Sequence, residues 1–219
     1  MERFFEHELG ELRKKLLAMG IHAIQAVRDS VDALDRRNTD LALRVKANDV
    51  VLDRFELEVD EMAIHLLAKA PLASDLRLVT MAMKLSQEFE RVGDEATKIA
   101  KRAVDLNQDA PLALHLDVRE MSAQVLGMLD AALDALIRRD SVAARAIIPR
   151  DRSVNALHKK IREEIIVHMQ KSPENILRCL HWMVAAKSLE RIGDHATNIA
   201  EEVVYLCEAQ DIRHLERVN

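Results

Sequence analysis

One acidic pair, a glutamate and an aspartate four residues apart, occurs in each of two copies of an eleven-residue segment. Residues 90–100 read ERVGDEATKIA and residues 190–200 read ERIGDHATNIA, so eight of eleven positions are identical at an offset of 100. Carboxylates one helical turn apart repel each other by a few tenths of a kcal/mol, and a bound cation reverses that cost. The repeated pairs therefore predict a metal site on each copy, with the ligands Glu90 and Asp94, and Glu190 and Asp194.

Further carboxylates lie one segment earlier in each half of the chain. Asp49 and Asp53 are one turn apart beside an apolar stripe, and the second half has Asp151 at the corresponding place. If the helices that carry these acids pack antiparallel, four carboxylates face each other across a groove in the first half. Asn155 replaces the fourth acid in the second half, with His195 as a further ligand, so we expect that site to be weaker. The alternative is a solvated acidic surface paired with neighbouring lysines and arginines.

No sequence pattern for catalysis accompanies these acids. The nine histidines include no Glu-x-x-His, the spacing that ferritin-type di-iron sites need. The motifs HExxH, GxGxxG, GxSxG and the P-loop are absent, and nothing combines a nucleophile with a base and an oxyanion hole. The sequence therefore predicts a protein that is not an enzyme. It leaves the metal open among iron, zinc, magnesium and manganese.

The elements that must position the acids are long helices. Only 5 glycines and 4 prolines occur in 219 residues and aromatic residues make up 3%, which is typical of an all-α protein. Apolar residues recur at three- to four-residue spacing, which favours packing in helical bundles. Pro149 is expected to split the fifth helix. The polar breaks predict six long helices, at 5–37, 41–70, 74–107, 112–139, 142–171 and 173–210.

The repeat extends beyond the motif to the helix breaks. Pro71 precedes the first copy and Pro173 the second, so the chain is a duplicated three-helix unit. We expect an all-α fold of two tandem three-helix bundles, with the first repeat at 1–108 and the second at 109–219. Gly93 recurs in both copies although glycine costs a helix interior about 1 kcal/mol relative to alanine. We expect either a ligand or a second backbone close to that position, or a plain helix–helix contact at a small residue.

Charge and hydropathy exclude several classes of protein. The net charge of −5 argues against a partner nucleic acid. The N-terminal residues have no apolar segment typical of a secretory signal, and no run approaches the roughly 20 apolar residues of a membrane span. Cys179 and Cys207 fall on one predicted helix, about 42 Å apart at the helical rise per residue, too far for a disulfide. We therefore expect a reduced, cytoplasmic protein.

The doubled motif in a six-helix chain resembles the PhoU family of phosphate transport accessory proteins. The resemblance covers nearly the whole chain, and the segment Pro71 to Arg77 is similar to the family's helix start. It implies a cytoplasmic homodimer that links the ATPase subunit of a phosphate ABC transporter to a phosphate sensor histidine kinase. Such a protein represses the phosphate-starvation response when phosphate is plentiful, and it meets the membrane only through its partners.

The resemblance also implies metal clusters on the acidic motifs. These motifs fall on Asp49 and Asp53 with Glu90 and Asp94, and on Asp151 with Glu190 and Asp194. Asn155 departs from the family's pattern and lowers the expected occupancy of the second site. Two other functions stay open. One is an accessory protein of a low-affinity phosphate carrier. The other is a metal-binding helical bundle with a non-signalling role, such as metal storage or metal-dependent catalysis.

Overall fold

Helices account for most of the residues that the computed structural model describes, namely 2–69 and 73–213. No strand occurs within these ranges, which confirms the all-α prediction. The six long helices are α1 Glu2–Asp35, α2 Thr39–Leu67, α3 Ala73–Leu106, α4 Val118–Arg138, α6 Asp151–Lys171 and α7 Ile176–Glu208. The short elements are α5 Ser141–Arg145 and two 3₁₀ turns, Ile148–Arg150 and Pro173–Asn175.

Local chemistry explains where several helices begin and end. The Asn38 side chain accepts a hydrogen bond from the Leu41 amide at 3.0 Å and starts α2, and Asp140 does the same for α5. Pro149 splits the predicted helix 142–171 into α5, a 3₁₀ turn and α6, as expected, because its ring cannot continue a helix. The predicted break at Ala70-Pro71 lies outside the described residues, as does Leu72 in the segment similar to the family's helix start.

The predicted start of the fourth helix at residue 112 is wrong. Residues 109–117 are not α-helical, and α4 begins at Val118. Pro111 disfavours helical backbone at its own position and before it. The leucines at 112, 114 and 116 are half-buried against the core while the residues between them are exposed. That alternation has the period of extended chain, so this segment covers the core without forming a helix.

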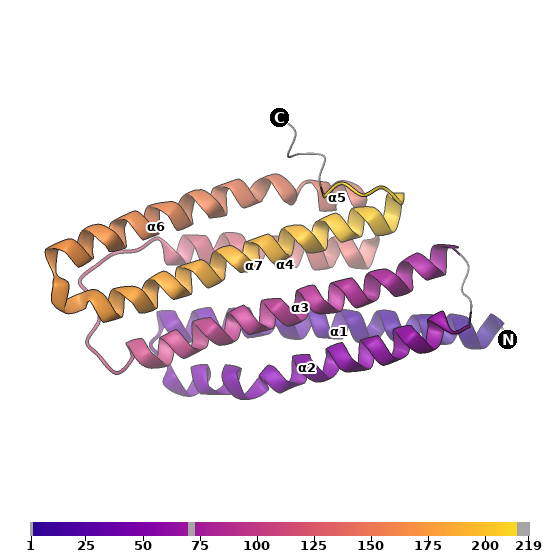
Figure 1. Cartoon of the computed structure of the whole chain (residues 1–219), viewed down its shortest axis with the longest axis horizontal. Coiled ribbons are helices and arrows are strands. Elements are labelled where there is room, and N and C mark those ends of the chain that lie inside the picture. The colour runs from indigo at the N-terminus through magenta and orange to yellow at the C-terminus, as the bar shows by residue number, and fades with distance from the viewer. Residues whose placement is uncertain (1, 70–72, 214–219) are drawn as a thin grey trace.

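The long helices run side by side in two tandem bundles (Figure 1). In the first, α1 packs on α2 and α3, and α2 packs on α3; in the second, α4 and α6 pack on α7. Helices α3 and α7, which carry the repeated motifs, meet in the middle of the molecule and join the bundles. This confirms the tandem arrangement of the predicted fold. The division at 108/109 falls in the connection between α3 and α4 and stays a prediction.

Charged side chains cross the interface between α3 and α7. His195 Nδ1 lies 2.8 Å from Glu88 Oε2, and Arg191 donates to Glu95 at 3.1 Å. Glu95 is buried, and hydrogen bonds from Lys98 and the other bundle hold its pKa below the usual range although burial opposes them. The two motif copies differ in charge at residues 95 and 195, and at residues 98 and 198. Three of these side chains, those of Glu95, His195 and Asn198, contact the opposite bundle.

Two further sequence predictions concern the pairing of the two cysteines and the presence of a membrane-spanning helix. Cys179 and Cys207 both lie on α7 and are free thiols, as predicted. Within the described ranges, no helix combines the length and the apolar character that crossing a bilayer requires.

The repeated glycines lie where α2 and α6 approach the motif helices. A Cβ atom at Gly93 would be 2.2 Å from Leu52 Cδ1, and one at Gly193 would be 3.3 Å from Val154 Cγ1. Leu52 and Val154 are themselves buried. The close approach expected at Gly93 is therefore a helix–helix contact, and the contact is tighter in the first bundle than in the second.

Substituting the two glycines should separate packing from helix propensity. Alanine at either position gains about 1 kcal/mol of helix propensity. We expect Gly93→Ala nevertheless to lower the thermal midpoint by about 2–4 °C, because Leu52 must move, and Gly93→Leu to lower it further. Gly193→Ala should leave it nearly unchanged. Thermal unfolding followed by circular dichroism measures the difference, and equal midpoints for all three variants would contradict this account.

Candidate functional site

Five carboxylates gather where α2 packs against α3. We call this group the first acidic cluster: Asp49, Asp53 and Glu56 of α2 with Glu90 and Asp94 of α3. Burial raises the pKa of Glu90, and the charges of Asp94, Glu56 and Asp53 raise it further. Burial also raises the pKa of Asp49, with added contributions from Asp94 and Asp53. The structure thus brings the four predicted residues of the first half together, with Glu56 as an addition.

The antiparallel packing of α2 and α3 sets this register. Thr97 Oγ1 donates to Asp49 Oδ1 at 3.0 Å, and Asn107 donates to Thr39 at 2.9 Å near the other end of the helix pair. About one turn beyond the Thr97–Asp49 pair, on the side away from Thr39, the side chain of Leu52 sits on Gly93. Because glycine allows this close approach, the acids on the flank of α2 come within electrostatic range of those on α3.

A second acidic cluster occupies the matching place between α6 and α7. It consists of Asp151, Asn155 and His158 of α6 with Glu190 and Asp194 of α7. Burial raises the pKa of Asp194 to about 6, and the charges of Glu190 and Asp151 act in the same direction. Asn155 Nδ2 donates to Asp151 Oδ2 at 2.6 Å, so the residue that replaces the fourth acid satisfies a carboxylate instead.

Asp151 is the least satisfied member of the second acidic cluster. Its Oδ1 atom is buried and has no hydrogen-bond partner among the described residues. That atom would lie 3.7 Å from a Cβ at Gly193, so it faces the backbone of the motif helix. Burial raises the pKa of Asp151, as does the charge of Glu190. A carboxylate oxygen in this position lacks the compensation that buried charge requires.

The sequence analysis missed Glu56 and His158. An offset of 102 relates α2 to α6, pairing Asp49 with Asp151, Asp53 with Asn155, and Glu56 with His158. Both missed residues lie three positions after the second member of the acidic pair, on the same side of the helix. Burial lowers the pKa of His158, while the charge of Glu190 acts against this. Helical spacing carried on from the predicted pairs could have identified them.

His195 does not take the predicted place as a further ligand of the second site. Its Nδ1 atom lies 2.8 Å from Glu88 in the opposite bundle, and Asn198 donates to the same carboxylate at 3.1 Å. Although burial opposes them, these two contacts hold the pKa of Glu88 below its usual range. His195 therefore belongs to the interface between α3 and α7.

The donor chemistry of both clusters suits cations. Carboxylate oxygens are the ligands of magnesium and manganese, and the imidazole of His158 adds a donor that zinc and iron accept. Within residues 2–69 and 73–213, however, no three His, Cys, Asp or Glu side chains already surround one point closely enough to hold a metal ion. The residue types fit a cation, and binding one requires rotation of these side chains.

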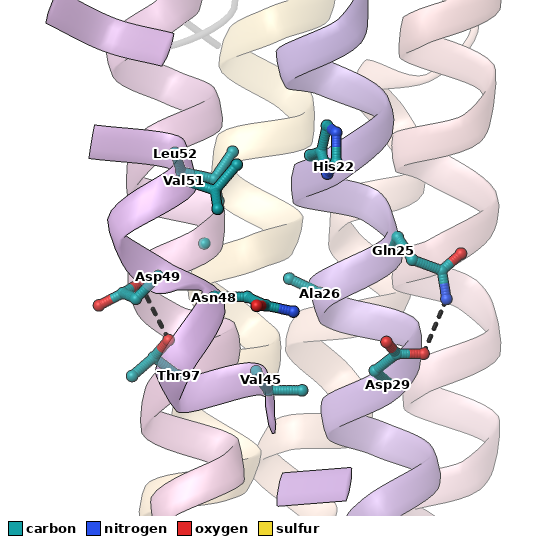
Figure 2. A pocket seen from close by; sticks show the side chains of 11 residues that line it. His22, Gln25, Ala26, Asp29, Val45, Asn48, Asp49, Val51, Leu52 and Thr97 are labelled. Atoms are coloured by element: carbon teal, nitrogen blue, oxygen red, sulfur yellow. Dashed lines mark hydrogen bonds between the residues drawn. The ribbon is translucent and has the colours of Figure 1, made fainter. Parts of the chain in front are cut away.

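A cavity of about 190 Å³ borders the first acidic cluster on the side of α1. Figure 2 shows the Asn48 side chain between α1 and α2, and the Asp49 carboxylate turned toward Thr97. Gln25 donates to Asp29 at 2.7 Å on the opposite wall. The described residues that line this cavity include no lysine or arginine. Because Asp29 and Asp49 in the lining would repel an anion and no cationic side chain offsets them, the cavity does not suit phosphate.

Neutralising Asp194 should change stability in a pH-dependent way. Folding raises the pKa of this carboxyl from its usual value to about 6, so the ionised group disfavours the folded state. In metal-free protein we expect Asp194→Asn to raise the thermal midpoint by about 2–6 °C at pH 7.5. The gain should fade between pH 6 and pH 4, as the folded wild-type protein takes up the proton. An equal difference at both ends of this pH range would contradict this account.

Comparison with known proteins assigns the family. Residues 16–103 and 118–203 each match the family profile described as the PhoU domain. The chain is 39% identical over 213 residues to a Pseudomonas putida protein named phosphate-specific transport system accessory protein PhoU homolog, covering 96% of this chain and 83% of that protein. It is 34% identical over 214 residues to the Serratia marcescens protein named phosphate-specific transport system accessory protein PhoU, covering 96% and 87%.

Solved structures agree with the sequence comparison. The crystal structure of PhoU from Pseudomonas aeruginosa superposes with a TM-score of 0.90 at 39% identity, covering 94% of this chain and all of that one. The phosphate transport system regulatory protein PhoU from Streptococcus pneumoniae superposes with a TM-score of 0.87 at 26% identity, covering 95% and 99%. With two matching domains, full-length relatives and the same fold, the chain belongs to the PhoU family.

Proposed function

We propose that this protein is an accessory protein of phosphate transport that represses the phosphate-starvation response when phosphate is plentiful. The observation that supports this is the pair of PhoU domains, together with near full-length relatives named for the phosphate-specific transport system. Its partners in this proposal are the ATPase subunit of a phosphate ABC transporter and a phosphate sensor histidine kinase. It acts in the cytoplasm, as a homodimer, and reaches the membrane only through the transporter.

Such a regulator works by binding and not by catalysis. An adaptor that binds one state of the transporter or kinase more tightly than another shifts that partner toward the bound state, by no more than the difference in affinity. Two bundles joined along α3 and α7 offer separate outer surfaces for two partners. The outer side of α6 exposes basic residues that suit an acidic protein surface: Arg152, Lys159 and Arg162.

Repression of alkaline phosphatase tests this function. A strain that lacks the gene should show high, constitutive activity in high-phosphate medium, and a plasmid copy should restore low activity. The same strains in low phosphate serve as the control, because both should then be derepressed. Activity that stays repressed in the deletion strain would remove the signalling function. It would leave the accessory role for a low-affinity carrier, or a metal-binding role without signalling.

We also propose that the two acidic clusters bind metal ions, drawn from iron, zinc, magnesium and manganese. The ligands would be Asp49, Asp53, Glu90 and Asp94 in the first, and Asp151, Glu190 and Asp194 in the second. Support comes from the pKa of Glu90 and of Asp194, which burial raises and which the charges of neighbouring carboxylates raise further. A bound cation would offset both effects. The buried, unpartnered oxygen of Asp151 offers a further ligand. The metal supplies positive charge that would hold each pair of helices together.

Paired substitutions should divide the metal content between the clusters. We expect Glu90→Gln with Asp94→Asn to lower bound metal by about half, because the second cluster stays intact. The matched variant Glu190→Gln with Asp194→Asn should lower it less, because Asn155 already weakens that cluster. Elemental analysis after dialysis measures both, with circular dichroism as the control for folding. Wild-type protein without bound metal would contradict the proposal, and lost helicity in the variants would show that the acids are structural instead.

A further inference from the structure

The outward face of α2 carries an apolar stripe with a seven-residue repeat. Leu43, Val50, Leu57 and Ile64 are 46%, 57%, 70% and 61% exposed. Seven residues are almost two helical turns, so these side chains form one line along the helix. The line lies opposite the face that α2 buries against its own bundle, and α2 forms an outer edge of the molecule (Figure 1). We call this line the α2 stripe.

The fold does not require apolar residues at these positions. By the offset of 102, Val50 corresponds to Arg152 and Leu57 to Lys159 on α6, and both basic residues are exposed. Ile64 corresponds to Ile166, which is 40% exposed and aliphatic as well. The second bundle thus forms the same structure with cations in place of the two central aliphatic side chains of the stripe. A continuous row of exposed aliphatic residues is typical of a surface that another protein covers, and the α2 stripe runs along the length of its helix.

The charges that flank the α2 stripe indicate the orientation of its partner. Exposed Lys46 lies beside its N-terminal half, and exposed Glu61 lies beside its C-terminal half. The exposed charges of Asp53 and Arg54 flank its centre, one on each side. Two parallel copies of this helix would place like charges together. Two antiparallel copies place the basic half of one beside the acidic half of the other. The stripe is therefore complementary to itself in the antiparallel orientation.

We infer that the α2 stripe is the self-association surface of this protein, on which a second copy packs its own α2 antiparallel about a two-fold axis. In this register Leu43 meets the partner's Ile64, and Val50 meets the partner's Leu57. Because each copy presents the same patch, the contact closes on itself as a dimer and leaves α6 facing outward. The inference rests on the homodimer named in the proposed function, and it does not depend on phosphate signalling.

Sedimentation of the full-length protein tests this surface. Val50→Glu with Leu57→Glu should convert the dimer to a monomer, raising the dissociation constant about 100-fold or more, because four carboxylates then face each other in an apolar contact. The matched control is Leu177→Glu with Leu180→Glu on α7, whose side chains are 64% and 47% exposed, and which should stay dimeric. A monomeric wild type would overturn the inference, as would a dimer that survives the first variant or dissociates in the control.

Disulfide cross-linking reports the orientation and does not rely on a destabilised variant. In a Cys207→Ser background, Val50→Cys with Leu57→Cys should give a covalent dimer, because each new thiol lies opposite the other residue of the pair. Leu43→Cys alone should not, because in the antiparallel dimer its two copies are about 30 Å apart. Cross-linking through Leu43→Cys alone, or none in the double variant, would overturn the antiparallel contact. Phosphatase repression by Val50→Glu with Leu57→Glu is scored separately, so either proposal can fail without the other.

Discussion

The packing of α3 against α7 is the contact on which the rest of the molecule depends. Each of these helices carries one copy of the motif, and each copy contacts two neighbours, a helix of its own bundle and the opposite bundle. One side, at Gly93 and Gly193, receives a side chain from the preceding helix of its own bundle. Another side carries Glu95 and His195, which contact Arg191 and Glu88 of the opposite bundle. A buried carboxylate without such a partner costs several kcal/mol, so these pairs constrain how the bundles are joined.

The glycine contacts within each bundle explain why the acidic clusters form where they do. Once the glycines allow α2 and α6 to approach, the acids on the flank of each helix come close to the acids of the motif. Burial raises the pKa of Glu90 and Asp194, and repulsion between the neighbouring carboxylates raises it further. A fold that holds like charges together loses stability unless a counter-ion relieves them. The clusters are thus a cost of the fold in the absence of a cation, which is why we connect them with metal binding.

The two bundles have the same helix arrangement and differ in their surface residues. The second half replaces Asp53 by Asn155 and Glu56 by His158, which lowers the negative charge of its cluster and adds a nitrogen donor. On the outer helices, the two central residues of the α2 stripe, Val50 and Leu57, correspond to basic residues on α6. Duplication gave two bundles with equivalent packing. Their exposed positions then diverged, because packing does not constrain exposed side chains. One protein can in this way present one surface for its own copy and another for acidic partners.

Much of this protein was determined by the sequence alone, because helical periodicity and the internal repeat are local properties. The long helices, the duplication, the acidic pairs and the family follow from spacing within single segments. The tertiary structure decided which direction each side chain faces relative to a neighbouring helix. It turned His195 toward Glu88, added Glu56 and His158 to the clusters, and kept residues 109–117 extended over the core. Spacing places side chains around one helix axis, but only the packing of helices against one another decides what lies opposite them.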